Sequence, residues 1–340
     1  MKIGIFGVGA VGGHVAVRLL AAQATAEASG KASTDASAVE VSLLVREKQR
    51  ARIVEHGLTL RTDEGDFTVY PTRVYTDPAT IEPQDLLIVG LKASSLAEHA
   101  ETIRDLLKPD GTVVFLINGI PWWWTYGQET LPRALRRLDP DRQLWEEIGP
   151  ERVVGCVVYS SNEVLEDGTI LNRGGNRYDL GEPRHAKTKR LNVLAELFTK
   201  SQIPVQISEN IHLDIWRKLL ANASGNPISA LTRLSSTPRG ADPLVSDLMV
   251  RFRQEVIDIG LALGLALTDD DKKLLVSVGN VRPSMLQDAI LQRPMEVDAI
   301  LGQTQVFARE KNISTPVLDT VHSLLHGLDV ANRIARESAE

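Results

Sequence analysis

The first thirteen residues constrain the fold of this chain more than any other stretch. Lys2 to Phe6 is a short apolar run typical of a buried strand, and Val15 to Leu20 carries a helical apolar pattern. A glycine-rich turn joins the two. A strand, a glycine turn and a helix in this order begin a dinucleotide-binding βαβ unit. The turn residues expected to hold the dinucleotide are Gly7, Val8, Gly9, Ala10, Val11 and Gly12.

Each glycine of this turn has its own expected task. Gly7 permits the tight turn, Gly9 leaves the backbone open to a pyrophosphate, and Gly12 lets the helix lie close to the strand. The helix N-terminus offers N–H groups and the positive end of its dipole to the phosphates. The alternative is a turn that binds nothing, but its place between a strand and a helix favours dinucleotide binding.

Length and composition narrow the class of protein. At 340 residues the chain exceeds what one core usually supports, so we expect two domains. The net charge of −6 argues against nucleic acid or an anionic membrane as a partner. No apolar run approaches the ~20 residues of a membrane span, and Met1 leads directly into the first strand without a signal peptide. Cys156 is the only cysteine, which indicates a reducing compartment, so we expect a cytoplasmic protein.

The pattern of elements changes near residue 208. Strand and helix patterns alternate before it, and only helical patterns follow it. We therefore predict an α/β protein with an N-terminal Rossmann-type domain at 1–208, followed by an all-α C-terminal domain at 209–340. The long helices of the second domain could pair between subunits in a homodimer. Ala21 to Ala38, rich in Ala, Ser and Thr, is expected to be a helix end plus a flexible insertion, and the sequence assigns it no function.

Arg46 suggests which dinucleotide binds. It directly follows the predicted second strand, 39–45, where an acidic residue would hold the 2′-hydroxyl of NAD and an arginine the 2′-phosphate of NADP. The sequence therefore favours NADPH. A shift of one residue in the strand end would put Glu47 there instead, and Arg46 would then be an ordinary surface charge.

Two more polar residues follow apolar runs typical of buried parallel strands. Lys92 ends the run at 86–91, and Asn118 ends the run at 112–117. Because ligands of open α/β sheets bind beyond the carboxyl ends of strands, both are expected near the cofactor. A lysine that merely caps a strand end is the alternative for Lys92. Trp122 to Trp124 come next, either as a pocket wall or as packing.

A polar stripe marks the predicted helix that begins at Ile211. Lys218, Asn222 and Asn226 are spaced four residues apart and share a face. Apolar neighbours would partly desolvate Lys218, and burial lowers a lysine pKa towards values useful for proton transfer. By itself, Lys218 is better explained as an amphipathic surface lysine. Asn226 followed by Pro227 is also typical of a helix N-cap.

The remaining candidates lie further along the second domain. Ser284 opens a predicted helix, and its plain explanation is an N-cap. Glu296 falls in the first turn of the next predicted helix, and its plain explanation is an acid stabilised by the helix dipole. His322 and His326 are four residues apart, but no third ligand accompanies them. We therefore expect a surface pair and no metal site.

These motifs resemble the ketopantoate reductase (2-dehydropantoate 2-reductase) family over nearly the whole chain. The glycine turn is shared by many enzymes, whereas the Lys–Asn–Asn helix combined with Ser284-Met285-Leu286-Gln287-Asp288 is far more specific. The resemblance implies NADPH-dependent reduction of a 2-oxo acid, 2-dehydropantoate or a related compound, to the 2-hydroxy acid in pantothenate biosynthesis. The partners are then a small 2-oxo acid and NADPH.

The resemblance also implies residue roles. Lys218 matches the general acid, and Glu296 belongs to the active-site hydrogen-bond network. Asn222 and Asn226 match residues that bind polar groups of the substrate, and Ser284 matches one that contacts its carboxylate. The matches that contact the cofactor or line its site are Arg46, Lys92 and Asn118.

Two departures bear on the substrate. Ile117 stands where the family commonly has glutamine, and the three tryptophans replace a smaller segment, so a bulkier 2-oxo acid is an alternative substrate. The competing hypotheses are another Rossmann-type hydroxy-acid or opine-like dehydrogenase and a catalytically silent NADP-binding sensor. The presence of Lys218, its asparagines, Ser284 and Glu296 together argues against both.

Overall fold

The computed structural model describes residues 1–28, 39–128, 133–273 and 280–338, so most of the expected insertion at Ala21–Ala38 lies outside the described residues. The chain divides into two compact units. Unit 1 is formed by Met1–Ile117, Trp122–Ala134 and Asp139–Ile211, and unit 2 by Asn118–Pro121, Leu135–Leu138 and His212–Glu340. The division follows packing rather than a single break in the chain.

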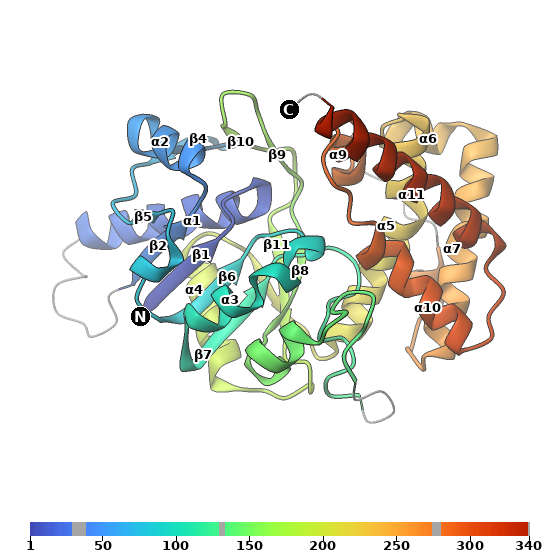
Figure 1. Cartoon of the computed structure of the whole chain (residues 1–340), viewed down its shortest axis with the longest axis horizontal. Helices are drawn as coiled ribbons and strands as arrows, with labels where there is room; N and C mark the ends of the chain where they lie inside the picture. Colours follow the sequence, from blue (N-terminus) through green and yellow to red (C-terminus); the bar gives the residue numbers. More distant parts are fainter. Residues whose placement is uncertain (29–38, 129–132, 274–279, 339–340) are drawn as a thin grey trace. The chain divides into compact units, whose positions relative to one another are not determined.

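Unit 1 is built on a five-stranded parallel sheet with the strand order β5-β2-β1-β6-β7 (Figure 1). Its strands are β1 (Lys2–Phe6), β2 (Glu40–Leu44), β5 (Val74–Tyr75), β6 (Gln84–Val89) and β7 (Leu107–Phe115). The central strand β1 is apolar because the sheet buries it on both faces, and Ile3 and Ile5 are at most 1% exposed. This confirms the parallel strands expected from the apolar runs.

Two smaller sheets complete unit 1. One has the order β4-β3-β10-β9 and the other β12-β11-β8. Their strands are β3 (Leu58–Thr62), β4 (Gly65–Val69), β8 (Gly155–Tyr159), β9 (Asn162–Val164), β10 (Ile170–Asn172), β11 (Arg177–Gly181) and β12 (Val205–Ile207). The helices of unit 1 are α1 (Ala10–Ala28), α2 (Glu47–His56), α3 (Ala100–Asp105) and α4 (Lys189–Lys200).

The segment after β6 is only partly α-helical. Two 3₁₀ turns, Ala93–Ser95 and Ala97–His99, precede the short α3, and Leu107 already belongs to β7. The Ser95 hydroxyl donates to the Lys92 carbonyl at 3.1 Å. A side chain that bonds the local backbone in this way competes with the α-helical pattern, which explains the tighter first turn.

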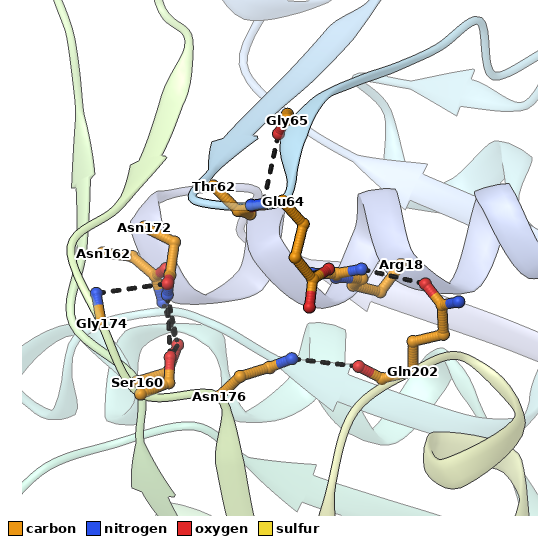
Figure 2. A network of polar contacts seen from close by, with 11 residues as sticks. Arg18, Thr62, Glu64, Gly65, Ser160, Asn162, Asn172, Gly174, Asn176 and Gln202 are labelled. Carbon is orange, nitrogen blue, oxygen red and sulfur yellow. Dashed lines mark hydrogen bonds and ion pairs between the residues drawn. The ribbon is translucent and has the colours of Figure 1, made fainter.

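Polar side chains fasten α1 to the smaller sheets (Figure 2). Arg18, 5% exposed, donates to Gln202 at 3.1 Å and to Glu64, at the β3–β4 turn, at 3.3 Å. One helical turn earlier, His14 is hydrogen-bonded to the Tyr178 hydroxyl at 3.1 Å. Burial lowers the pKa of His14 to about 3, so this histidine is neutral. These contacts hold the helix that begins at the glycine turn.

The regular elements of unit 2 are all helices within the described residues, which confirms the predicted fold class. Its helices are α5 (Ile211–Thr232), α6 (Ser236–Ala241), α7 (Pro243–Ala262), α8 (Asp269–Lys272), α9 (Ser284–Ile290), α10 (Gln303–Glu310) and α11 (Pro316–Glu337), with a π-helical turn, Asp298–Gly302, before α10. Trp216 is fully buried beside Phe307 and donates from Nε1 to the Val256 carbonyl at 3.2 Å. No helix within the described ranges is long and apolar enough to cross a bilayer.

The expected helix break at Asn226 is wrong. α5 continues through Pro227 to Thr232, so Asn226 lies inside a helix and is not an N-cap. Proline removes one backbone hydrogen bond from a helix. The residues around it are buried, with Ala223 and Ala230 at 0% and Ile228 at 2% exposed. Packing of this apolar face therefore outweighs the local signal.

The histidine pair also differs from its expected place on the surface. His322 is 9% exposed, and its Nε2 lies 3.4 Å from Nη2 of Arg137, which forms an ion pair with Asp298. Burial lowers the pKa of His322. His326 is exposed. His322 thus helps to hold the segment Leu135–Leu138 within unit 2.

Candidate functional site

The glycine turn of unit 1 has the geometry that a pyrophosphate requires. Gly7 has a φ of +92°, and a Cβ on Gly12 would lie 2.1 Å from the Gly7 carbonyl oxygen. A Cβ on Gly9 would meet no atom of the described residues within 4 Å, and Gly9 is exposed. α1 starts directly after Gly9, and the first N–H groups of a helix have no partner within it. The turn therefore fits the pyrophosphate of a dinucleotide.

Arg46 lies at the start of the second helix of unit 1. It is the N-cap residue of α2, and its exposed side chain makes no hydrogen bond to the described part of the chain. Gln49, one turn into α2, donates from Nε2 to the Val8 carbonyl. This contact ties the helix that carries Arg46 to the glycine turn. Arg46 is thus free to meet a phosphate next to that turn.

Lys92 lies just beyond β6, as its position in the sequence predicts. It is partly buried, and its backbone carbonyl accepts hydrogen bonds from the N–H and the hydroxyl of Ser95. The contact expected between its ammonium and the cofactor stays a prediction.

The tryptophan run is part of the core of unit 1. Trp122, Trp123 and Trp124 are each at most 2% exposed. Trp122 stacks edge-on against Phe115 and Trp145, with ring centroids 5.7 Å and 6.5 Å away. Of the two interpretations that the sequence left open, burial at this depth favours packing over a pocket wall.

Lys218, Asn118 and Glu296 form a connected polar group within unit 2. Nζ of Lys218 donates to Oδ1 of Asn118 at 2.7 Å, and Nδ2 of Asn118 donates to Oε2 of Glu296 at 3.1 Å. All three side chains are partly buried. The amide orientation follows from its neighbours, because a flipped amide would turn its NH₂ towards the ammonium and its oxygen towards the carboxylate.

A close backbone contact fixes Asn118 in this group. Gly119 has a φ of +82°, and a Cβ there would lie 2.3 Å from the Ala299 carbonyl oxygen. The next residue, Ile120, donates its N–H to the same oxygen at 2.7 Å. The segment 118–121 is thereby held against the π-helical turn that follows Glu296. Glu296 itself stands just before that turn, and its carbonyl accepts the Ile300 N–H.

The proposed substrate residues keep free hydrogen-bonding groups. Asn222 and Asn226 lie on α5 beyond Lys218 and are partly buried, and their amides make no hydrogen bond to the described residues. Ser284 is exposed at the first position of α9, and Pro283 is the N-cap residue, so the cap explanation for Ser284 is wrong. No structural partner within the described ranges occupies these three side chains.

Sequence reasoning missed the partnership of Asn118 with Lys218. The positions are a hundred residues apart, and the strand before Asn118 pointed to the cofactor instead. The Asn-Gly pair was the available signal, because a glycine after a polar residue often marks a turn with positive φ.

Within the described residues, no cluster of three or more His, Cys, Asp or Glu could hold a metal ion.

Together these features define a class of protein: a Rossmann-type, nucleotide-dependent oxidoreductase whose helical unit carries an ammonium bonded to an amide, which is bonded in turn to a carboxylate. Two family models match the chain, Ketopantoate reductase PanE/ApbA over residues 3–185 and Ketopantoate reductase PanE/ApbA C terminal over residues 210–329. The chain belongs to the ketopantoate reductase family. The family models and the relatives confirm both the family and the NADPH-dependent oxidoreductase function that the sequence predicts.

Individual relatives agree with the family models. The chain is 34% identical to the 2-dehydropantoate 2-reductase of Mesorhizobium japonicum, over 97% of this chain and 98% of that protein. A crystal structure of 2-dehydropantoate 2-reductase from Geobacter metallireducens matches with a TM-score of 0.79 and 26% identity, over 96% and 99% of the two chains. D-mandelate dehydrogenase, solved with NADH and anilino(oxo)acetate, shares the fold with a TM-score of 0.79 at 20% identity, over 98% and 100%.

Proposed function

We propose that this protein reduces 2-dehydropantoate, or a closely related 2-oxo acid, to the 2-hydroxy acid, with Lys218 as general acid. The observation that carries the proposal is the hydrogen-bonded group of Lys218, Asn118 and Glu296. Residues 1–208 would hold NADPH, and residues 209–340 would hold the substrate. A cytoplasmic homodimer belongs to the same proposal. A neighbouring structure from Staphylococcus aureus is described as a dimeric ketopantoate reductase.

The residues expected to hold NADPH are the glycine turn, Arg46 and Lys92. When bound, NADPH supplies the hydride that reduces the ketone carbon. The backbone at Gly9 and the first turn of α1 would bind the pyrophosphate, and the Arg46 guanidinium would bind the 2′-phosphate by a charge-assisted hydrogen bond. Arg46 suits this role because it is exposed and its side chain is not engaged by the described residues.

Lys218 supplies the proton. Negative charge develops on the ketone oxygen during reduction, and an ammonium in place beforehand stabilises it and then transfers a proton to it. An ammonium has three N–H groups, and one of them is directed to Asn118. The amides of Asn222 and Asn226 and the Ser284 hydroxyl would bind the polar groups of the acid.

Asn118 then acts by positioning Lys218. In Asn118→Ala the ammonium loses its fixed partner, so we expect kcat to fall at least tenfold, the scale of losing a hydrogen bond to a charged group. If Asn118 acted mainly on the cofactor, the dissociation constant of NADPH would rise instead. Steady-state kinetics with a 2-oxo acid and fluorescence titration with NADPH separate the two effects. An unchanged kcat would remove Asn118 from the proposal.

Arg46 should set the choice between NADPH and NADH. In Arg46→Gln the 2′-phosphate loses its charged partner, and we expect the affinity for NADPH to fall at least tenfold while that for NADH stays within about twofold. Lys48→Gln is the matched control, because Lys48 is an exposed cation two residues further on. Equal losses for both nucleotides would show that the 2′-phosphate binds elsewhere.

The direct test of the proposed function is a panel of 2-oxo acids, followed by the decrease in NADPH absorbance. We expect turnover of 2-dehydropantoate or of a near relative with a bulkier side chain. Failure of every 2-oxo acid would favour the silent sensor. The bulkier alternative remains because Ile117 departs from the glutamine common in the family.

A further inference from the structure

A buried arginine lies against the middle of α5. Arg239, on α6, is 7% exposed, and its Nη1 donates to the Gly225 carbonyl at 2.7 Å and to the Ser229 hydroxyl at 2.8 Å. A Cβ on Gly225 would lie 3.1 Å from both Nη1 and Nη2 of this arginine. The guanidinium therefore packs directly on the helix at a position without a side chain.

This guanidinium has neutral partners only, as far as the described residues extend. No carboxylate among them forms an ion pair with Arg239, and its Nε is buried without a hydrogen-bond partner. Burial lowers the pKa of Arg239, because desolvation disfavours the charged form. A buried charge without a counter-charge is strongly unfavourable, so an anion bound at Arg239 would be strongly stabilised.

The arginine lies along the polar face of α5. Steps of four, three and four residues lead from Lys218 through Asn222 and Gly225 to Ser229, so all four positions share one helix face. With a rise of 1.5 Å per residue, Lys218 and Gly225 are about 10 Å apart along the axis. Because the ketone and the carboxylate of a 2-oxo acid are on adjacent carbons, the long Lys218 side chain must reach along the helix for both groups to be bound at once.

Ser284 comes from a segment that is bonded to α6. The Ser236 N–H donates to the Val281 carbonyl at 2.9 Å, and the Val281 N–H donates to the Ser236 hydroxyl at 2.8 Å. Arg239 and Ser284 each follow this pair by three residues. Ser284, which is expected to contact the substrate carboxylate, and Arg239, whose charge is uncompensated, therefore belong to two segments that are hydrogen-bonded to each other.

We propose that Arg239 binds the carboxylate of the substrate and makes the site selective for 2-oxo acids over neutral ketones. The inference rests on the proposed function. A carboxylate would supply the missing counter-charge and could accept from the planar guanidinium, whereas a neutral ester or amide would leave the charge uncompensated. The Ser284 hydroxyl can add a hydrogen bond to the carboxylate but no charge.

The test compares a 2-oxo acid with its methyl ester. For the wild-type protein we expect kcat/KM to be at least 100-fold higher for the acid, as expected when a desolvated charge loses its partner. Arg239→Met should lower kcat/KM for the acid about 100-fold, mainly through KM, and change that for the ester by less than about threefold. A purely structural role would lower both values equally.

Two further variants control for folding. Arg239→Lys keeps the charge and should retain most of the preference for the acid. Arg253→Lys is the matched control, because Arg253 is a second buried arginine of unit 2, 3% exposed, whose Nη2 donates to the Asp271 carbonyl at 2.7 Å. It should affect stability but leave the acid-to-ester ratio unchanged.

The outcomes separate this inference from the proposed function. A wild-type protein that reduces acid and ester equally well overturns the role of Arg239 even if no variant folds. A preference for the acid that survives in Arg239→Met overturns it as well. A wild-type protein that reduces no 2-oxo acid with NADPH overturns the proposed function itself.

Discussion

Lys218→Met is expected to lower kcat at least 100-fold, the usual scale for the loss of a general acid. The variant removes the proton donor and the positive charge that stabilises the developing alkoxide, while the hydrocarbon chain keeps its packing on α5. The NADPH dissociation constant should change by less than about twofold, because the glycine turn, Arg46 and Lys92, which are expected to bind the nucleotide, lie in unit 1. Single-turnover kinetics at saturating NADPH measure the effect on the chemical step.

Two companion variants sharpen this experiment. Lys218→Arg keeps a positive charge and a hydrogen-bond donor for Asn118, but a guanidinium is a far weaker proton donor than an ammonium, so little activity should return. Lys311→Met removes an exposed lysine at the end of α10 and should leave kcat unchanged. Full activity in Lys218→Met would exclude Lys218 from the chemistry.

Gly9→Ala should weaken NADPH binding, whereas Gly12→Ala should destabilise the fold. At Gly9 a methyl group has room in the folded chain but occupies the surface that the pyrophosphate would approach. We expect the variant to fold normally and to bind NADPH at least tenfold more weakly. At Gly12 the same methyl group would lie 2.1 Å from the Gly7 carbonyl oxygen, so the backbone must move. The free energy of unfolding should fall by about 3 kcal/mol.

Thermal unfolding and NADPH titration distinguish the two effects. The Gly9 variant should unfold at the wild-type temperature in the absence of nucleotide. NADPH should raise its unfolding temperature less than that of the wild type, because stabilisation by a ligand grows with the logarithm of its concentration divided by its dissociation constant. Normal NADPH affinity in Gly9→Ala would mean that the dinucleotide does not approach this turn. A stable Gly12→Ala would contradict the close contact between Gly12 and Gly7.

Local sequence signals predicted those elements whose formation depends only on a few neighbouring residues. The strand, glycine turn and helix at the N-terminus are confirmed. A parallel strand buried on both faces requires an apolar run, and a tight turn requires glycine. These requirements are visible in the chain itself.

Signals failed where packing outweighed them. Asn226-Pro227 has the composition of a helix start, yet the buried face of α5 carries the helix across it. The tryptophan run was compatible with a pocket wall or with a core, and only the neighbours Phe115 and Trp145 decide between these. His322 is buried by contacts with Arg137, which is 185 residues away in the chain.

The sequence by itself determined the family, the order of the α/β and the helical domain, and the candidate site residues. It could do so because residue type and spacing encode strand burial, glycine turns and helix faces. Only the tertiary structure decided that Asn118 joins Lys218 to Glu296 and that Arg239 lies uncompensated against Gly225. Contacts between distant positions depend on how elements pack, and no local pattern of residues specifies that packing.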